Sequence, residues 1–263
     1  MRYNYSMTQV PLDFRLPFVK KEQLTDDAWS FFFDRTVYPD LSFLPGQYVR
    51  MTLDIPQTDE RGNSRFFSIS SSPLNKEYLI ITTRILQSAF KKTLASVSPG
   101  TDVKFFGPVG RFILNEEEGR PHIFLAGGIG VTPFHSMLVD AAEKNLSLPI
   151  TLFVSFSTVE EIVFYEELMK ISADHSNIKV IYTVTRPEVT TLATSSATEK
   201  EIAVWKGETG RISGDLIKKY VSDSISSIFY ISGSPVMVDA MLALVKEIGI
   251  PDEQVKKEKF IGY

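Results

Sequence analysis

The pattern of the sequence changes near residue 117, and this change restricts the fold more than any other feature of the chain. Up to that point, short β-prone runs at 29–33, 48–53, 78–83 and 102–106 are separated by prolines and glycines. Many short strands divided by turn residues predict an antiparallel β-barrel or sandwich. After residue 120, apolar strand-like runs alternate with helix-like stretches, which is typical of a parallel doubly wound α/β sheet.

The second half also carries clear signals for where helices begin and end. Its predicted buried strands are 123–126, 150–154, 179–184 and 228–231. Ser213 and Ser234 stand where helix caps belong, and Gly249 follows the last helical stretch. The chain therefore repeats a strand and a helix several times.

These two patterns predict two domains, a β-barrel over 1–117 and an α/β domain over 118–263, joined by the polar linker 115–121. The Thr- and Ser-rich stretch 188–201 is predicted to be an exposed loop. No apolar run approaches the roughly 18 residues of a membrane span, and the N-terminus has no apolar signal region. A cytoplasmic protein without a membrane span is therefore expected.

The composition excludes several kinds of site. The chain has no cysteine, which rules out disulfides, thiolate zinc sites and cysteine-ligated iron–sulfur clusters within it. Its three histidines, His122, His135 and His175, lie far apart without metal-ligand spacing, so no metal site is expected. The net charge of −4 argues against a nucleic-acid partner.

The first chemical signal is the run 65–68, with Arg65, Phe67 and Ser68. Side chains alternate along a strand, so Arg65 and Phe67 share one face. An arginine fork binds phosphate in bidentate fashion, and a flat ring beside it suits a cofactor with phosphates at one end and a ring at the other. Ser68 offers its hydroxyl to a polar ring atom. An edge strand with an exposed arginine and two core phenylalanines explains the run equally well.

The second signal is a predicted short helix that begins at Ser88. Free backbone N–H groups at a helix start can hold a pyrophosphate, and Lys91 can add positive charge. Taken alone, a capped surface helix with solvated lysines is the preferred interpretation.

Two glycine turns follow predicted strands of the second half. The first, 127–133, resembles a dinucleotide loop because glycines let a backbone approach phosphate, and three glycines with a Thr132–Pro133 helix start favour that function over a plain tight turn. It is not the G-x-G-x-x-G fingerprint, because residue 133 is proline. The second turn, 232–237, should lie on the same rim of the sheet, although an ordinary strand–helix connection explains it equally well.

Together and in this order, these segments resemble the ferredoxin–NADP reductase superfamily over most of the chain. The run 65–68 is similar to the flavin motif Arg-x-Tyr-Ser/Thr, 107–112 to the turn that ends the FAD barrel, and 127–133 to the nicotinamide-nucleotide loop. The run 232–235 resembles the Cys-Gly-Pro-Pro turn, and 258–263 the aromatic C-terminal segment.

Two positions depart from the family pattern. Phe67 replaces the motif tyrosine, which would keep stacking but lose a hydroxyl contact to the ribityl chain. Ser232 replaces the cysteine beside the nicotinamide, a residue that tunes the geometry of hydride transfer in the family. The second change bears on the rate and not on the class of reaction.

The resemblance implies an FAD-dependent oxidoreductase that takes hydride from NADH or NADPH and passes electrons to an external carrier such as ferredoxin or flavodoxin, or to an oxygenase partner. It implies catalytic roles for Ser68, Ser232 and Tyr263. The implied cofactor-binding residues are Arg65, Phe66, Phe67, Ser68, Arg84, Ser88, Ala89, Phe90, Lys91, Gly127, Gly128, Gly130, Val131, Thr132, Gly233, Ser234, Pro235 and Met237. Three alternatives stay open: a flavin or ferric reductase with a small-molecule acceptor, a non-enzymatic electron-transfer subunit of a larger complex, and a nucleotide-binding sensor.

Three finer expectations concern partners and coenzyme. Five lysines allow two interpretations: they form a basic rim that binds an acidic carrier protein, or they are simply solvated. These lysines are Lys91, Lys92, Lys256, Lys257 and Lys259. The segment 156–161 contains two acids and no base, which predicts a weak preference for NADH unless Arg186 or Arg211 reaches the 2′-phosphate. Finally, Phe260 or Tyr263 either lies against the flavin ring, or Phe260 simply covers the sheet edge.

Overall fold

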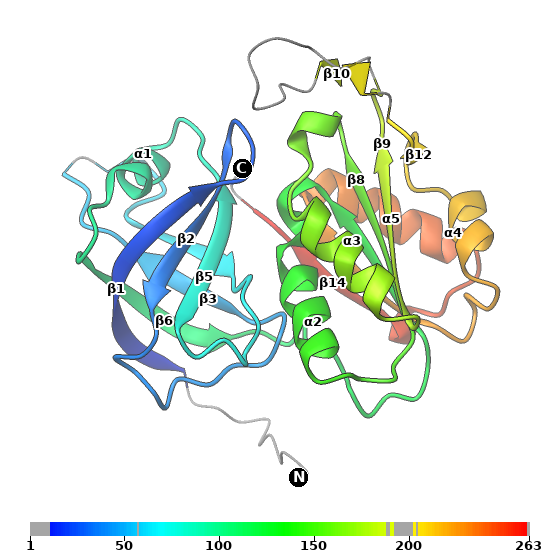
Figure 1. Ribbon diagram of the computed structural model, residues 1–263, viewed down its shortest axis with the longest axis horizontal. Coiled ribbons are helices and arrows are strands. Elements are labelled where there is room, and N and C mark those ends of the chain that lie inside the picture. The colour runs from blue at the N-terminus through cyan, green and yellow to red at the C-terminus, as the bar shows by residue number, and fades with distance from the viewer. Residues whose placement is uncertain (1–10, 57, 188–189, 192–201, 204, 262–263) are drawn as a thin grey trace.

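The computed structural model describes residues 11–56, 58–187, 190–191, 202–203 and 205–261, and these form two halves, each built on a six-stranded sheet (Figure 1). The first half is antiparallel, the second parallel. The sheets change over between β6 and β7, where the polar segment 115–121 lies. That 1–117 and 118–263 are separate domains stays a prediction.

The antiparallel sheet has the strand order β4-β3-β6-β1-β2-β5. Its strands are β1 (Leu12–Gln23), β2 (Ala28–Asp34), β3 (Tyr48–Thr52), β4 (Ser64–Ser68), β5 (Tyr78–Arg84) and β6 (Asp102–Val109). A bridge between Ile69 and Ile81 brings the two edge strands together, so the sheet curls toward a barrel. Its interior is packed with phenylalanines, and the rings of Phe33 and Phe105 meet edge to face at 5.0 Å. The helix that the structure describes in this half, α1 (Ala89–Ser96), contributes Phe90 to that core.

The parallel sheet has the order β12-β9-β8-β7-β13-β14. Its strands are β7 (His122–Gly127), β8 (Ile150–Phe156), β9 (Ile178–Val184), β12 (Glu208–Thr209), β13 (Ile228–Gly233) and β14 (Val255–Lys259). The chain runs outward from β7 in one direction and then returns to β13 on the other side. Ligands of such sheets bind where the strand order reverses, beyond the carboxyl ends of the strands. That point lies between β7 and β13.

Helices cover both faces of the parallel sheet. One face is packed by α2 (Thr132–Glu143) and α3 (Tyr165–Asp174), the other by α4 (Gly214–Tyr220) and α5 (Pro235–Glu247). The predicted caps are confirmed, since Ser213 and Ser234 accept from the backbone N–H groups of Leu216 and Met237. The short elements are η1 (Gly128–Val131), η2 (Val159–Glu161), η3 (Asp252–Gln254), β10 (Thr190–Thr191) and β11 (Ile202–Ala203).

The stretch 188–201 was predicted to be a loop. Within it the structure describes the short strand β10, and the other residues lie outside the described part of the chain. Among the helices that the structure describes, none is both long enough and apolar enough to cross a membrane.

Candidate functional site

Two clefts open where the halves meet. The first, the barrel cleft, has a volume of about 540 Å³ and runs from Arg65 and Lys91 to Thr132, Glu258 and Phe260. The second, the glycine pocket, has a volume of about 500 Å³ and lies over the ends of β7, β8 and β13. Both volumes fall within the range of small-molecule sites. The described part of the chain therefore has room for two ligands side by side.

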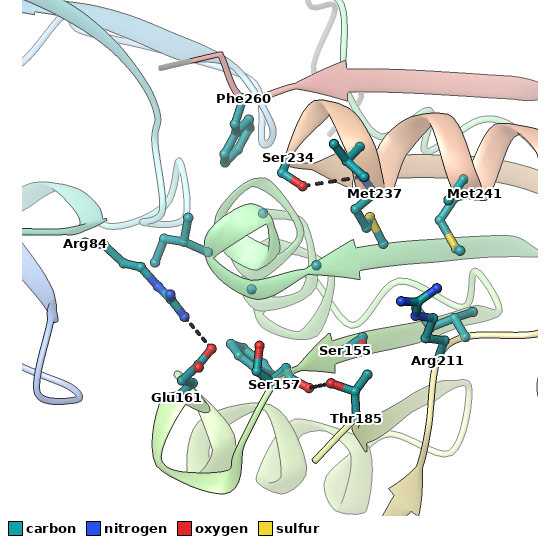
Figure 2. Close-up of a pocket in the computed structure, with 18 of the residues that line it drawn as sticks. Arg84, Ser155, Ser157, Glu161, Thr185, Arg211, Ser234, Met237, Met241 and Phe260 are labelled. Carbon is teal, nitrogen blue, oxygen red and sulfur yellow. Dashed lines mark hydrogen bonds and ion pairs between the residues drawn. The ribbon is translucent and has the colours of Figure 1, made fainter. Parts of the chain in front are cut away.

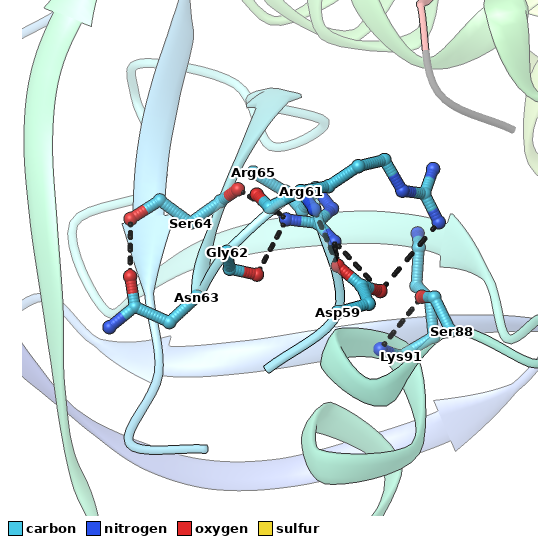
Figure 3. A network of polar contacts seen from close by, with 8 residues as sticks. All are labelled: Asp59, Arg61, Gly62, Asn63, Ser64, Arg65, Ser88 and Lys91. Atoms are coloured by element: carbon cyan, nitrogen blue, oxygen red, sulfur yellow. Dashed lines mark hydrogen bonds and ion pairs between the residues drawn. The ribbon is translucent and has the colours of Figure 1, made fainter. Parts of the chain in front are cut away.

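Arg65 stands at one end of the barrel cleft, but its guanidinium already has a partner. Its Nη2 donates to both carboxylate oxygens of Asp59, at 3.0 and 3.3 Å (Figure 3). Its Nη1 donates to the carbonyls of Arg61 and Ser64 at 2.8 and 2.7 Å. Asp59 was not among the predicted site residues. An incoming phosphate must compete with this carboxylate for the same fork.

Arg65 and Phe67 lie on the same side of β4, as alternation predicts. The guanidinium sits 5.2 Å from the ring of Phe90, and the ring of Phe67 packs against that same ring at 5.8 Å. Phe90 is fully buried and lies behind both residues, so it supports the cleft from below and is not placed to touch a ligand. Ala89 does not line the cleft either.

Lys91 completes the cationic end of the barrel cleft, whereas Ser88 is not among its lining residues. The predicted helix does begin here, since the Ser88 hydroxyl accepts from the Lys91 N–H at 3.3 Å. The Lys91 ammonium is buried, donates to Thr83 Oγ1 and lies 4.8 Å over the Phe67 ring. Burial, reinforced by the charges of Arg65 and Arg61, lowers the pKa of Lys91 to about 7. An anion in this cleft would stabilise the charged form of Lys91.

The five lysines do not form a single basic rim, which corrects that expectation. Lys91 is buried, and Lys256 donates to the hydroxyl of Tyr230 at 3.0 Å. Lys259 forms an ion pair with Asp239 at 2.6 Å. Strand alternation in β14 sends Lys256 to one face and Lys257 and Lys259 to the other. Lys257 does line the barrel cleft.

A serine and a glutamate meet at the other end of the barrel cleft. Ser68 Oγ donates to Glu258 Oε2 at 3.3 Å, across the boundary between the two halves. Burial raises the pKa of Glu258 to about 7, although the hydrogen bond from Ser68 acts in the opposite direction. A carboxyl poised near neutrality is suited to accept or release a proton. Glu258 was not among the predicted site residues.

Ser232 is placed beside the same carboxyl by the register of β13 and β14, which pairs Ser232 with Glu258. Ser232 is completely buried, and its Oγ has no hydrogen-bond partner among the described residues. An orphaned buried hydroxyl is unusual, but Ser232 is not among the lining residues of either cleft. The structure thus brings Ser68 and Ser232 near one another, whereas the third predicted catalytic residue, Tyr263, lies outside the described residues.

Thr132 and Phe66 line the same cleft in different ways. Thr132, at the start of α2, is buried and donates to the carbonyl of Ile129 at 3.1 Å. Phe66 points to the opposite face of β4 from Phe67, and is 64% exposed with its edge on the ring of Tyr48. Phe66 therefore lies at the mouth of the cleft.

The glycine pocket is formed by the two predicted turns, and they touch backbone to backbone. A Cβ on Gly130 would lie only 2.6 Å from Gly233 Cα and from the carbonyl oxygen of Ser232, so a larger residue cannot be accommodated there. Gly128, in contrast, has a positive φ of 53° and faces open space, with Arg84 at 4.0 Å as the nearest group. Gly130 thus serves packing, and Gly128 leaves room for a ligand.

The other residues predicted for this pocket also fall into two groups, those that line the pocket and those that serve packing. Gly127, Ser234 and Met237 line it (Figure 2), whereas Val131 is fully buried and Gly233 and Pro235 are not among its lining residues. Val131 and Pro235 therefore have structural roles in the turns.

Arg84, predicted to bind a cofactor, lines the glycine pocket and not the barrel cleft. Its Nη2 donates to Glu161 at 2.9 Å, and its Nη1 lies 3.7 Å from Asp27. Because Glu161 comes from the second half, Arg84 ties the two halves together across the pocket (Figure 2).

The far end of the glycine pocket presents hydroxyls and one cation. Ser157 and Thr185, at the ends of β8 and β9, line it together with Arg211. The acid among its lining residues, Glu161, is held by Arg84. This end therefore suits an anionic group.

Phe260 lines both clefts and so marks the point where they meet (Figure 2). Its backbone N–H donates to the carbonyl of Gly233 at 2.9 Å, which fixes it beside the second glycine turn. β14 is the outer strand on this side of the parallel sheet, and Phe260 follows directly after it. A ligand in either cleft would meet the ring of Phe260.

Comparison with known proteins gives a consistent result. Residues 124–242 match the oxidoreductase NAD-binding domain family. The chain is 30% identical, over 84% of its length, to the toluate 1,2-dioxygenase electron transfer component of Pseudomonas putida. It is 25% identical, over 83% of its length, to the ferredoxin–NAD(P)(+) reductase component of the naphthalene 1,2-dioxygenase system of the same species. The chain spans 59% and 60% of these two relatives.

Among solved structures, a ferredoxin NADP+ reductase from Neisseria gonorrhoeae with bound FAD and NADP superposes with a TM-score of 0.73. The match covers 95% of this chain and 99% of that one, at 18% identity. The shared feature is the whole fold, an antiparallel barrel followed by a parallel α/β sheet.

Proposed function

Because this chain belongs to the superfamily of FAD- and NAD(P)-binding reductases that includes ferredoxin–NADP reductase, we propose that it carries electrons from a reduced nicotinamide through FAD to an external acceptor. It is an NAD(P)H oxidoreductase of that family. The observation that supports the full proposal best is Phe260, which lines both clefts and so lets ligands of the two approach one another.

The barrel cleft fits FAD. Its cationic end, with Arg65, Lys91 and the N-terminus of α1, suits a diphosphate. Phe67 would flank the ring system, and Ser68 would hydrogen-bond a polar ring atom. When bound, FAD supplies the hydride-accepting and electron-releasing chemistry. The protein supplies position, and the Ser68–Glu258 pair can hold or move a proton at Ser68 Oγ.

The glycine pocket fits the nicotinamide nucleotide. Gly128 leaves room for the diphosphate beside the start of η1 and α2, where the structure shows no side-chain cap on the backbone N–H groups. Thr132 lines the barrel cleft at its junction with this pocket, where the reacting ring would lie. Ser232 lies behind this junction, with its hydroxyl buried and without a partner among the described residues.

The acceptor is proposed to be a separate one-electron carrier or an oxygenase component, as the names of the relatives suggest. A cysteine-ligated cluster cannot be built from these 263 residues, which contain no cysteine. The test is steady-state NADPH oxidation with ferredoxin, flavodoxin, free flavin mononucleotide or ferric citrate as acceptor. Reduction of a protein carrier at the highest kcat/KM supports the proposal, and a clear preference for free flavin or ferric iron favours the small-molecule alternative.

Arg211 revises the expected preference for NADH. Its place beside Ser157 and Thr185 suits the 2′-phosphate of NADPH, a group that NADH lacks. We expect Arg211→Ala to lower the NADPH-over-NADH ratio of kcat/KM about tenfold, since a hydrogen bond to a charged group contributes about 1.5 kcal/mol at the low end. Arg186→Ala is the matched control, because Arg186 does not line the pocket. An unchanged ratio in Arg211→Ala would refute the assignment.

The C-terminal residues are expected to regulate access to the junction of the clefts. Deleting residues 261–263 should alter the flavin spectrum and change nicotinamide affinity roughly two- to tenfold, the scale of an aromatic contact. Thermal stability should be nearly unchanged, because Phe260 keeps its backbone bond to Gly233. Absorption spectra, NADP+ titrations and melting curves check this. A lower melting temperature with an unaltered spectrum would show that the segment is structural.

A further inference from the structure

The two halves are joined along a short seam between α2 and the segment 70–72 that follows β4. His135 Nδ1 lies 2.7 Å from the carbonyl oxygen of Ser70. The next residue, Ser136, donates to the carbonyl of Ser71, also at 2.7 Å. The two contacts are buried. Two adjacent side chains of α2 thus contact backbone carbonyls of the barrel half.

His135 holds a second acceptor with its other ring nitrogen. Its Nε2 lies 2.8 Å from Glu167 Oε2 on α3. The hydrogen bond from His135 lowers the pKa of Glu167, so the carboxylate is an acceptor only. A backbone carbonyl is likewise an acceptor only. A neutral imidazole carries one N–H, so both bonds exist together only when the ring is a doubly protonated imidazolium.

Two neighbours of the ring, Glu167 and Phe164, favour this charged state, although burial acts against it. His135 is 8% exposed, and the ring of Phe164 stacks on it at 3.9 Å. The charged group that faces it from α3 is Glu167, and the barrel half presents the Ser70 carbonyl. When the ring loses a proton, the remaining N–H should stay with the carboxylate, because a charge-assisted bond is the stronger one. The bond across the seam is then the one that breaks.

The seam lies next to the chemistry. Ser70 follows Ser68 by two residues, and His135 follows Thr132 by less than one helical turn. Ser68 and Thr132 both line the barrel cleft, and Thr132 also follows the first glycine turn. The His135–Ser70 bond is therefore placed to influence how the two cofactor sites lie relative to one another, together with the seam bonds from Ser136 to Ser71 and from Ser72 to Glu143.

We propose that His135 is a positioning residue which, as an imidazolium, fastens the barrel half to α2 and α3 and sets the distance between the two cofactor clefts. This inference rests on the proposed function only for its effect on hydride transfer. A displacement of about 1 Å can slow a reaction about a hundredfold. Loss of the seam bond should slow hydride transfer at least tenfold while leaving the separate affinities for FAD and NADP+ unchanged.

Two conservative substitutions separate the two bonds. In His135→Asn the side-chain amide can donate near the position of Nδ1 and so keep the bond to Ser70. In His135→Gln it can donate near the position of Nε2 and keep only the bond to Glu167. Anaerobic stopped-flow reduction by NADPH should show a rate near that of the unmodified protein for Asn, and a rate at least tenfold lower for Gln.

The pH profile gives a readout that a merely structural role would not move. The pH profile of the Asn variant should differ from that of the unmodified protein, because an amide has no ring proton to gain or lose. Equal slowing in Asn and Gln, or an unchanged rate in His135→Leu, would overturn the proposal. Melting curves confirm that each variant is folded.

A measurement without cofactors keeps this inference distinct from the proposed function. The chain has three histidines, so the ring ¹⁵N signals can be assigned with the His135→Asn variant as reference. Two protonated ring nitrogens on His135 at the pH of fastest reduction support the proposed role of His135, and a neutral ring at that pH contradicts it. If NADPH fails to reduce the FAD-loaded protein, the proposed function fails, while the same spectra, recorded at neutral pH, still decide the state of His135.

Discussion

Replacing Glu258 with glutamine is expected to slow electron release to a one-electron carrier about a hundredfold, the lower end of what general acid–base catalysis contributes. With FAD bound in the barrel cleft, Ser68 would be placed to receive the proton that complete reoxidation releases and to pass its own hydroxyl proton to Glu258, which it contacts at 3.3 Å. Glutamine keeps the size of the side chain and a hydrogen-bonding oxygen but cannot take up the proton.

The pH dependence of this step follows from the pKa of about 7 for Glu258. Below pH 7 the carboxyl is protonated and cannot accept a proton, so acceptor reduction should rise as pH increases through about 7. Glu258→Gln should flatten this rise, and Ser68→Ala should slow the step at every pH. Glu253→Gln, at an exposed position just before β14, is the control. An unchanged pH profile in Glu258→Gln would contradict the role given to this carboxyl.

Replacing Arg65 with alanine should weaken FAD binding roughly ten- to hundredfold. Hydrogen bonds to charged groups contribute about 1.5–3 kcal/mol, and Arg65 supplies the fork at the cationic end of the barrel cleft. Fluorescence titration of the FAD-free protein measures the effect. Unchanged FAD affinity in Arg65→Ala would remove this residue from the site.

The ion pair with Asp59 offers a matched control for that experiment. Asp59→Asn frees the Arg65 guanidinium from a charged competitor while keeping a side chain of the same size. FAD should then bind more tightly than to the unmodified protein, by a few fold at most, since the pair is partly exposed. Opposite effects of the two substitutions would show that the arginine binds the cofactor and that the aspartate competes with it.

Much of the fold could be predicted because it depends on local patterns. The change from short strands to strand–helix repeats gave the order of the two sheets, and the caps at Ser88, Ser213 and Ser234 are confirmed. The described strands β1, β10, β11, β12 and β14 were not predicted, and three of them, β10, β11 and β12, are only two residues long. β1 contains Pro17 and a bulge near Phe18, and β14 reads as a charged run, since Val255–Lys259 contains three lysines and a glutamate.

The site was predictable only where one segment carries its chemistry. The glycine turns at 127–130 and 232–234 are local and were found. Glu258 and Ser68 are 190 residues apart in the sequence and meet only through the contact of the two halves. His135 and Asp59 gain their importance in the same way, from partners on other segments. The prediction of a basic lysine rim was wrong for a related reason, since the number of lysines in a segment does not show which way their side chains point.

The central claim is that this chain passes hydride from a nicotinamide to FAD, and anaerobic titration of the FAD-loaded protein with NADPH tests it most directly. The account predicts that flavin absorbance bleaches stoichiometrically with added NADPH, and more slowly in Arg211→Ala at equal, subsaturating concentration. Protein that binds FAD and NADPH but keeps an oxidised flavin spectrum, or that binds no FAD at all, would contradict it.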